Sequence, residues 1–81
     1  MAKQVHYLKI LPEYFELVKI GKKTFEVRKN DRGFKEGDCL LLREWNIKHY
    51  TGRQQACEVI YILDNKEYCK EGYIIMGIRR I

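Results

Sequence analysis

The chain has 81 residues, of which 46% are hydrophobic and 33% charged, and its formal net charge is +5. This length excludes a second domain, so we expect residues 1–81 to form one, and the composition excludes disorder. The positive charge is typical of proteins with an acidic partner, most commonly nucleic acid, although a merely soluble basic protein has the same balance.

The cysteines Cys39, Cys57 and Cys69 are odd in number and lack the spacing of a zinc knuckle. Two histidines do not complete a metal site, so we expect no metal and no cofactor. Free thiols are typical of a reducing compartment, which predicts a cytoplasmic protein. We expect no signal peptide and no membrane contact, because no apolar run approaches the length of a membrane span.

The first predicted elements are a strand and a short helix. Residues 5–11 alternate in polarity, so we expect Leu8 and Ile10 to point into the core and Lys9 to point away from it. Pro12 ends this strand and suits the first position of a helix over about residues 12–20. Gly21 is then expected to take a left-handed conformation after the helix.

The stretch from Gly21 to Arg32 is the most highly charged in the chain. Read as a strand, it places Phe25 and Val27 on one face, which we expect to be the core face. Glu26 and Arg28 would then lie on the opposite face and open onto a cleft. The alternative is an ordinary solvated strand face with one ion pair.

Three more strands are expected over residues 39–45, 54–64 and 73–79. Thr51-Gly52 is a predicted turn, and Gly77 marks a bulge or a close approach between strands. Because an open sheet this small would leave costly edges, we predict a small α+β fold: a β-barrel of about five strands with the helix packed across one end.

The stretch Gly21-Lys22-Lys23-Thr24-Phe25-Glu26-Val27-Arg28 resembles the G-x-K-x-x-E-x-R signature of the ASCH domain family, which belongs to the PUA-like superfamily. Segments along nearly the whole chain resemble a small bacterial and phage group of that superfamily, the DUF3850 type. They include His6-Tyr7-Leu8-Lys9-Ile10, Leu42-Arg43-Glu44-Trp45 and Gly72-Tyr73-Ile74-Ile75-Met76-Gly77-Ile78. The resemblance implies a PUA-like barrel and, as a habit of the superfamily, binding of RNA or a modified nucleobase.

Some ASCH proteins are amidohydrolases that remove an acyl group from N4-acetylcytidine. Their proposed catalytic groups are the signature lysine, a threonine of the signature strand and a distant glutamate. Lys23 matches the lysine, but Glu26 occupies the position of the catalytic threonine, and Thr24 lies elsewhere on the strand. The distant glutamate would be one of Glu58, Glu67 and Glu71.

The first functional hypothesis is therefore a binding module for RNA or a modified nucleoside. A carboxylate accepts a hydrogen bond from the exocyclic amine of a base, a guanidinium holds a phosphate or a base edge, and an aromatic ring stacks on a base. The expected ligand-binding residues are Lys9, Lys23, Thr24, Glu26, Arg28, Trp45 and Tyr50. The expected phosphate contacts are Lys22, Lys29, Arg32, Lys48 and Arg53.

Two other functions stay open. In a hydrolase acting on an N4-acylated cytidine, Lys23 and Glu26 would be the catalytic residues. The third hypothesis is an accessory domain for protein interactions. For single residues the structural alternatives are that Trp45 packs at the end of the barrel, that Tyr50 covers the barrel mouth and that His6 is a hydrogen-bonded residue of a packed face. The sequence leaves the oligomeric state open.

Overall fold

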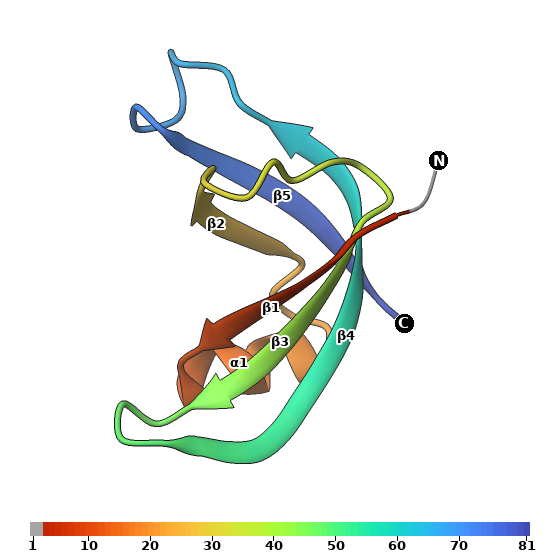
Figure 1. The fold of residues 1–81 in the computed structure, drawn as a ribbon, viewed down its shortest axis with the longest axis vertical. Helices are drawn as coiled ribbons and strands as arrows, with labels where there is room; N and C mark the ends of the chain where they lie inside the picture. The colour runs from red at the N-terminus through yellow and green to blue at the C-terminus, as the bar shows by residue number, and fades with distance from the viewer. Residues whose placement is uncertain (1–2) are drawn as a thin grey trace.

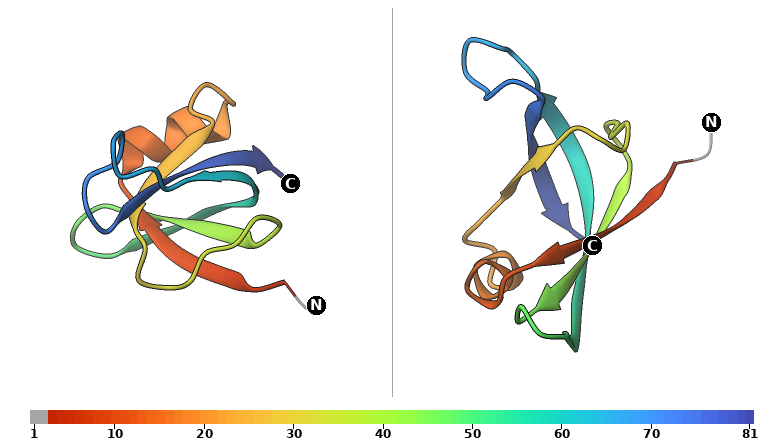
Figure 2. Two further views of the ribbon diagram at one scale, coloured as in Figure 1. Left: turned by 90° about the horizontal axis from the view of Figure 1, so that it is seen from above. Right: turned by 60° about the vertical axis from the view of Figure 1, so that its left-hand side comes forward.

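The protein is a five-stranded mixed sheet curled into a half-barrel, with one helix across an end (Figures 1 and 2). A computed structural model describes residues 3–81. The elements are β1 (Val5–Ile10), α1 (Pro12–Lys19), β2 (Phe25–Lys29), β3 (Cys39–Trp45), β4 (Tyr50–Leu63) and β5 (Tyr73–Arg80). The predicted α+β barrel is thereby confirmed. No helix within these residues is long and apolar enough to cross a membrane.

The strands follow the order β1-β3-β4-β5-β2, so β1 and β2 are the two edges of the sheet. β1 runs parallel to β3, and the other neighbours are antiparallel. The sheet closes around an apolar core to which β1 contributes Leu8 and Ile10, as predicted. β3 contributes Leu40 and Leu42, and β5 contributes Met76.

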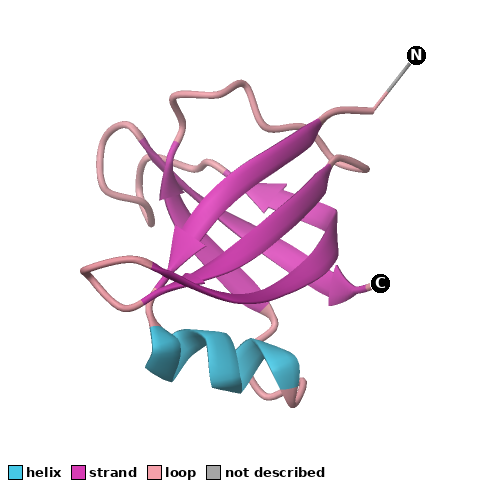
Figure 3. Cartoon of the chain, turned by 60° about the horizontal axis from the view of Figure 1, so that its bottom comes forward, coloured by secondary structure: helices cyan, strands magenta, loops and turns pink. Residues whose placement is uncertain are grey.

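Helix α1 begins at Pro12 and lies across the ends of β3 and β4 (Figure 3). It buries Phe15 and Val18 against the sheet. At its end Gly21 has φ +81°, the left-handed conformation that the sequence predicted. The N–H of Gly21 bonds to the carbonyl of Val18, and the N–H of Lys22 bonds to that of Leu17. This pair of bonds is a Schellman motif, which sets the direction in which the chain leaves the helix.

The predicted turn at Thr51-Gly52 is wrong, because both residues belong to β4. The β3–β4 turn lies earlier, where the Asn46 side-chain oxygen accepts from the N–H groups of Lys48 and His49. Trp45 pairs with Tyr50 and Arg43 with Gln54, so β4 carries two extra residues at this point. Gly52, with φ +95°, lies in this bulge. A second bulge, at Ile60 of β4, lies across from Gly77 of β5.

The orientation predicted for β2 is also wrong. Phe25 and Val27 are 46% and 51% exposed, whereas Glu26 is only 4% exposed and points into the barrel. The inversion has an electrostatic reason. Glu26 lies between two cationic side chains that neutralise it, so the carboxylate is buried as part of a bonded cluster rather than as a lone charge.

Candidate functional site

The candidate site lies where the turn after α1 meets β2 and where β2 faces the edge of β1. The Lys23 side chain reaches the site because its backbone is held in place directly before β2. The N–H of Lys23 bonds to the carbonyl of Leu17, which also accepts from the N–H of Lys22. The helix end therefore fixes the base of the Lys23 side chain, and the strand alternation brings Glu26 and Arg28 to the same inner face.

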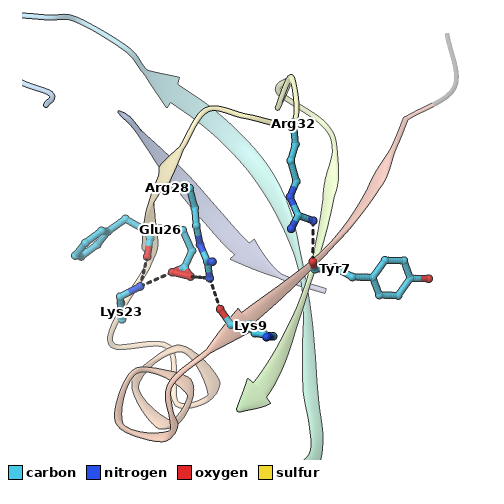
Figure 4. A network of polar contacts seen from close by, with 7 residues as sticks. Tyr7, Lys9, Lys23, Glu26, Arg28 and Arg32 are labelled. Atoms are coloured by element: carbon cyan, nitrogen blue, oxygen red, sulfur yellow. Dashed lines mark hydrogen bonds and ion pairs between the residues drawn. The ribbon is translucent and has the colours of Figure 1, made fainter. Parts of the chain in front are cut away.

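The centre of the site is the Glu26 carboxylate, which bonds to a cation on each side (Figure 4). Lys23 Nζ donates to Glu26 Oε2 over 2.9 Å and to the carbonyl of Phe25 over 2.6 Å. Arg28 Nη2 donates to Glu26 Oε1 over 3.1 Å. The Glu26 side chain is 6% exposed. The three side chains carry a net positive charge, and each carboxylate oxygen keeps a free lone pair, since a carboxylate offers about four acceptor positions.

Arginine side chains span the open seam between the two edge strands. Arg28 Nη2 also donates to the carbonyl of Lys9 over 2.7 Å, and Arg32 Nη1 donates to the carbonyl of Tyr7 over 2.9 Å. Both carbonyls lie on the edge of β1 that no strand covers (Figure 4). The barrel is thus closed on this side by guanidinium groups rather than by a backbone ladder.

A cleft of about 430 Å³ opens at this seam. Lys23, Glu26 and Arg28 form its polar part, and the exposed side chains of Tyr14 and Phe25 belong to its apolar wall. The other lining residues are Lys9, Ile10, Leu11 and Val27. A charged floor with an apolar and aromatic rim suits a flat ligand that carries polar groups on one edge.

The negative charge of Glu26 affects a thiol in the barrel core, that of Cys57. Burial, and secondarily the negative charge of Glu26, raise the pKa of the Cys57 thiol to about 11. Cys57 is fully buried and is therefore an inert core residue. In residues 3–81 the three cysteines are free, and no group of three or more His, Cys, Asp or Glu side chains could hold a metal ion.

Four of the predicted ligand-binding residues lie away from the cleft floor. Lys9 lends the cleft its backbone carbonyl, while its side chain turns to the outer face of the sheet (Figure 4). There its Nζ lies 4.2 Å from the centre of the Trp45 ring, and Trp45 packs edge-on against Tyr50. Thr24 lines a neighbouring depression beside Arg79 and Arg80.

The predicted phosphate contacts are scattered. Lys22 lies in a depression next to the cleft, beside Lys23 and Phe25. Arg53 is bonded to Glu16 over 2.5 Å and stacks on the ring of Phe15. Lys29, Arg32 and Lys48 lie at the end of β2, at the seam and at the tip of the β3–β4 turn.

Sequence reasoning missed a second buried carboxylate, Glu44, which is 4% exposed. Its Oε1 accepts from the Thr51 hydroxyl over 2.6 Å, and its Oε2 lies 3.8 Å from Arg53. The sequence signal for this contact was a hydroxyl and an arginine, those of Thr51 and Arg53, in the β4 bulge across from Glu44. The turn predicted at Thr51-Gly52 concealed it. Of the three C-terminal glutamates considered for the site, Glu58 pairs with Arg79, and Glu67 and Glu71 are exposed.

His6 and Asp38 form a second buried polar pair away from the site, and the predicted structural role of His6 is confirmed. The ring lies 4.6 Å from that of Phe34, and its Nε2 lies 2.8 Å from Asp38 Oδ2. Both partners are buried.

The fold and the cleft define a class of small basic half-barrel with a buried, doubly paired carboxylate at its seam. Within that class the chain belongs to the family described as "Domain of unknown function (DUF3850)", which matches residues 5–78. It is 36% identical, over 76 residues, to the "Uncharacterized 12.9 kDa protein in GpA 3'region" of Escherichia phage P2. That match covers 94% of this chain and 69% of the phage protein.

The fold is similar to that in the "Crystal structure of hypothetical protein PH0355", with a TM-score of 0.65. The match covers 96% of this chain and 99% of that one at 19% sequence identity, so it concerns the fold alone.

Proposed function

We propose that the protein binds RNA or a modified nucleoside, with one base held in the cleft against Glu26. The observation that carries the proposal is the buried Glu26 carboxylate at the base of a cleft walled by exposed apolar side chains. Its remaining lone pairs would accept from the exocyclic amine of a cytosine or an adenine. Tyr14 and Phe25 would contact the face of the base.

Two further observations support a nucleic-acid ligand over a neutral one. The cleft is net positive, and the whole chain carries +5. The signature from Gly21 to Arg28 resembles that of the ASCH family, in a superfamily that commonly binds RNA. Lys23 and Arg28 would face a phosphate or a base carbonyl, since ammonium and guanidinium groups only donate.

The alternative of amide hydrolysis would use the same side chains. Binding is the function we prefer because Lys23 Nζ already donates to Glu26 and to the Phe25 carbonyl, so the two groups are engaged with each other. A free base and a free oxyanion donor would both require this pair to separate.

Titration calorimetry with cytidine, adenosine and uridine tests the proposal. We expect cytidine and adenosine to bind more tightly than uridine, which has no exocyclic amine. Glu26→Gln should abolish this preference, because an amide oxygen and nitrogen replace two charged acceptors. Glu67→Gln is the matched control: it makes the same chemical change in an exposed loop. Equal affinities for the three nucleosides, unchanged by Glu26→Gln, would contradict the proposal.

The same preparations should be incubated with N4-acetylcytidine and analysed for free cytidine. Release of cytidine that depends on both Lys23 and Glu26 would establish the hydrolase in place of the binding module.

A further inference from the structure

A second cationic site lies on the outer face of the sheet, across β1 from the cleft. Lys9 and Arg43 are register neighbours in the β1–β3 pair, and both side chains approach the ring of Tyr50. The distance to the ring centre is 5.9 Å from Lys9 Nζ and 4.0 Å from Arg43 Cζ. Lys9 also lies over Trp45, whose ring centre is 4.9 Å from that of Tyr50. Two cations thus converge on one aromatic pair.

These two cations lack acidic partners. Within residues 3–81 neither the Lys9 nor the Arg43 side chain forms an ion pair or donates a hydrogen bond to the protein. Gln54, which pairs with Arg43 across β3 and β4, is uncharged. Neighbouring like charges repel, and the aromatic rings offset this only in part. An anion between the two would remove the repulsion and use donors that are otherwise free.

The site and the cleft meet at one residue. The backbone carbonyl of Lys9 lies at the seam, where it accepts a hydrogen bond from Arg28. The ammonium group of Lys9 lies on the outer face, over the ring of Trp45. Because β1 is one of the two edge strands, no further strand stands between its outer face and the cleft. A polynucleotide can cross this edge, whereas a free nucleoside reaches one side only.

We propose that Lys9 and Arg43, held on the rings of Trp45 and Tyr50, form a phosphodiester-binding subsite for the RNA strand whose base occupies the cleft. This inference rests on the proposed function, and it makes the ligand an oligonucleotide rather than a free nucleoside. The aromatic pair serves to hold the two cations in place and lies beside the strand as it leaves the cleft.

Trp45 is the only tryptophan of the chain and does not line the cleft, so its fluorescence reports on the outer site alone. We would titrate the protein with cytidine and with a short oligocytidylate RNA, following Trp45 emission and the heat of binding. The oligonucleotide should change the emission, and cytidine should bind without changing it.

The test variant is Lys9→Gln with Arg43→Gln, and the matched control is Lys66→Gln with Lys70→Gln. The control removes the same charge from the loop between β4 and β5, where Lys70 also lies over an aromatic ring, that of Tyr73. The test variant should weaken oligocytidylate binding about tenfold and lower the salt slope by about 0.7 for the lost phosphate contact. The single variant Arg43→Gln, which changes no residue that lines the cleft, should keep the wild-type affinity for cytidine. Circular dichroism checks that both variants are folded.

Oligocytidylate affinity that is equal in the test variant and its control would overturn the subsite, even where Glu26→Gln shows that the cleft binds cytidine. If instead Glu26→Gln leaves cytidine binding unchanged, the cleft function is overturned, and the subsite, which assumes a base in the cleft, is overturned with it. Absence of any oligocytidylate binding at low salt would also overturn the subsite.

Discussion

At the scale of single residues, Asp38 shows how the barrel accommodates a buried charge. Its carboxylate lies within 2.8 Å of His6 Nε2 and accepts from the N–H groups of Gln4 and Lys35. Burial alone would raise the pKa of this carboxyl. The hydrogen bonds from His6, Gln4 and Lys35, together with the charge on His6, outweigh burial and hold the pKa below 3.8.

This shift predicts an acid-sensitive contribution to stability. A carboxyl whose pKa is lower in the folded state stabilises the protein fully above its unfolded pKa of 3.8. The contribution is lost as the pH falls through the lower folded value. Urea unfolding at a series of pH values should therefore show wild type losing stability below 3.8 more steeply than Asp38→Asn. Parallel curves for the two proteins would contradict the assignment.

The same residue shows a limit of sequence reasoning. His6 could be predicted as a structural residue because it shares a strand face with Leu8 and Ile10. Its partner could not, because Asp38 lies 32 residues away along the chain. A polar pair between distant segments leaves no periodic pattern, so the buried carboxylate of Asp38 was missed. Glu44 was missed for another reason, because its partner Thr51 was assigned to a turn.

At the scale of elements, β2 shows that alternation defines two faces without saying which is inside. Phe25 and Val27 were expected to be buried because apolar faces usually are. They are exposed because the opposite face of β2 points inward, where Glu26 forms ion pairs with Lys23 and Arg28 at the barrel seam. The pattern itself held a hint, since Lys23 and Arg28 bracket Glu26 at spacings that a turn and a strand place on one face.

The inverted strand makes a direct prediction. Val27→Lys should change the free energy of unfolding by less than about 0.5 kcal/mol, as exposed substitutions usually do. Glu26→Ala should cost about 3 kcal/mol, because it leaves Lys23 and Arg28 without their shared carboxylate. Urea unfolding of both variants checks that Glu26→Ala lowers the free energy of unfolding more than Val27→Lys does. The reverse order, with Val27→Lys more damaging, would restore the orientation first inferred from the sequence.

The helix end makes another prediction about an element. A Cβ at Gly21 would lie 2.8 Å from Arg80 Nη2, and the Arg80 guanidinium donates to the carbonyl of Lys19, the last residue of α1. Gly21→Ala should therefore add displacement of Arg80 to the strain of φ +81°, for a total of about 2 kcal/mol.

Gly33→Ala is the control for Gly21→Ala, because Gly33 has φ +62° with no atom within 4 Å of the added Cβ. It should show the backbone strain alone, about 1 kcal/mol. Equal losses in urea unfolding would mean that Arg80 moves aside without cost.

At the scale of the whole molecule, the order of the predicted elements and the composition were enough to predict the barrel and the helix that covers its end. The polarity pattern of the strands, the proline that begins α1 and the glycine after its end are local features, and they located most elements within a few residues. The incomplete closure could not be predicted, because it depends on which strands become edges. That order places β1 beside β3 and leaves β2 facing β1 without a backbone ladder.

The arginine-closed seam leads to a prediction for the dynamics of the barrel. Arg28 and Arg32 bond to the free carbonyls of Lys9 and Tyr7, so they restrain the two sheet edges against each other. Replacing both with glutamine should let the edges separate more often, and amide hydrogen exchange in β1 and β2 should accelerate several-fold. Exchange at the centre of β3 and β4, where the pairing is continuous from Cys39 to Arg43 of β3, should change little.

Arg79→Gln is the matched control for the seam, because Arg79 makes an ion pair with Glu58 elsewhere on the sheet. Its exchange rates in β1 and β2 should equal those of wild type. If the seam variant exchanges uniformly faster in all strands, the arginines stabilise the fold globally. If it exchanges no faster than the control, the barrel holds its two edges together without them.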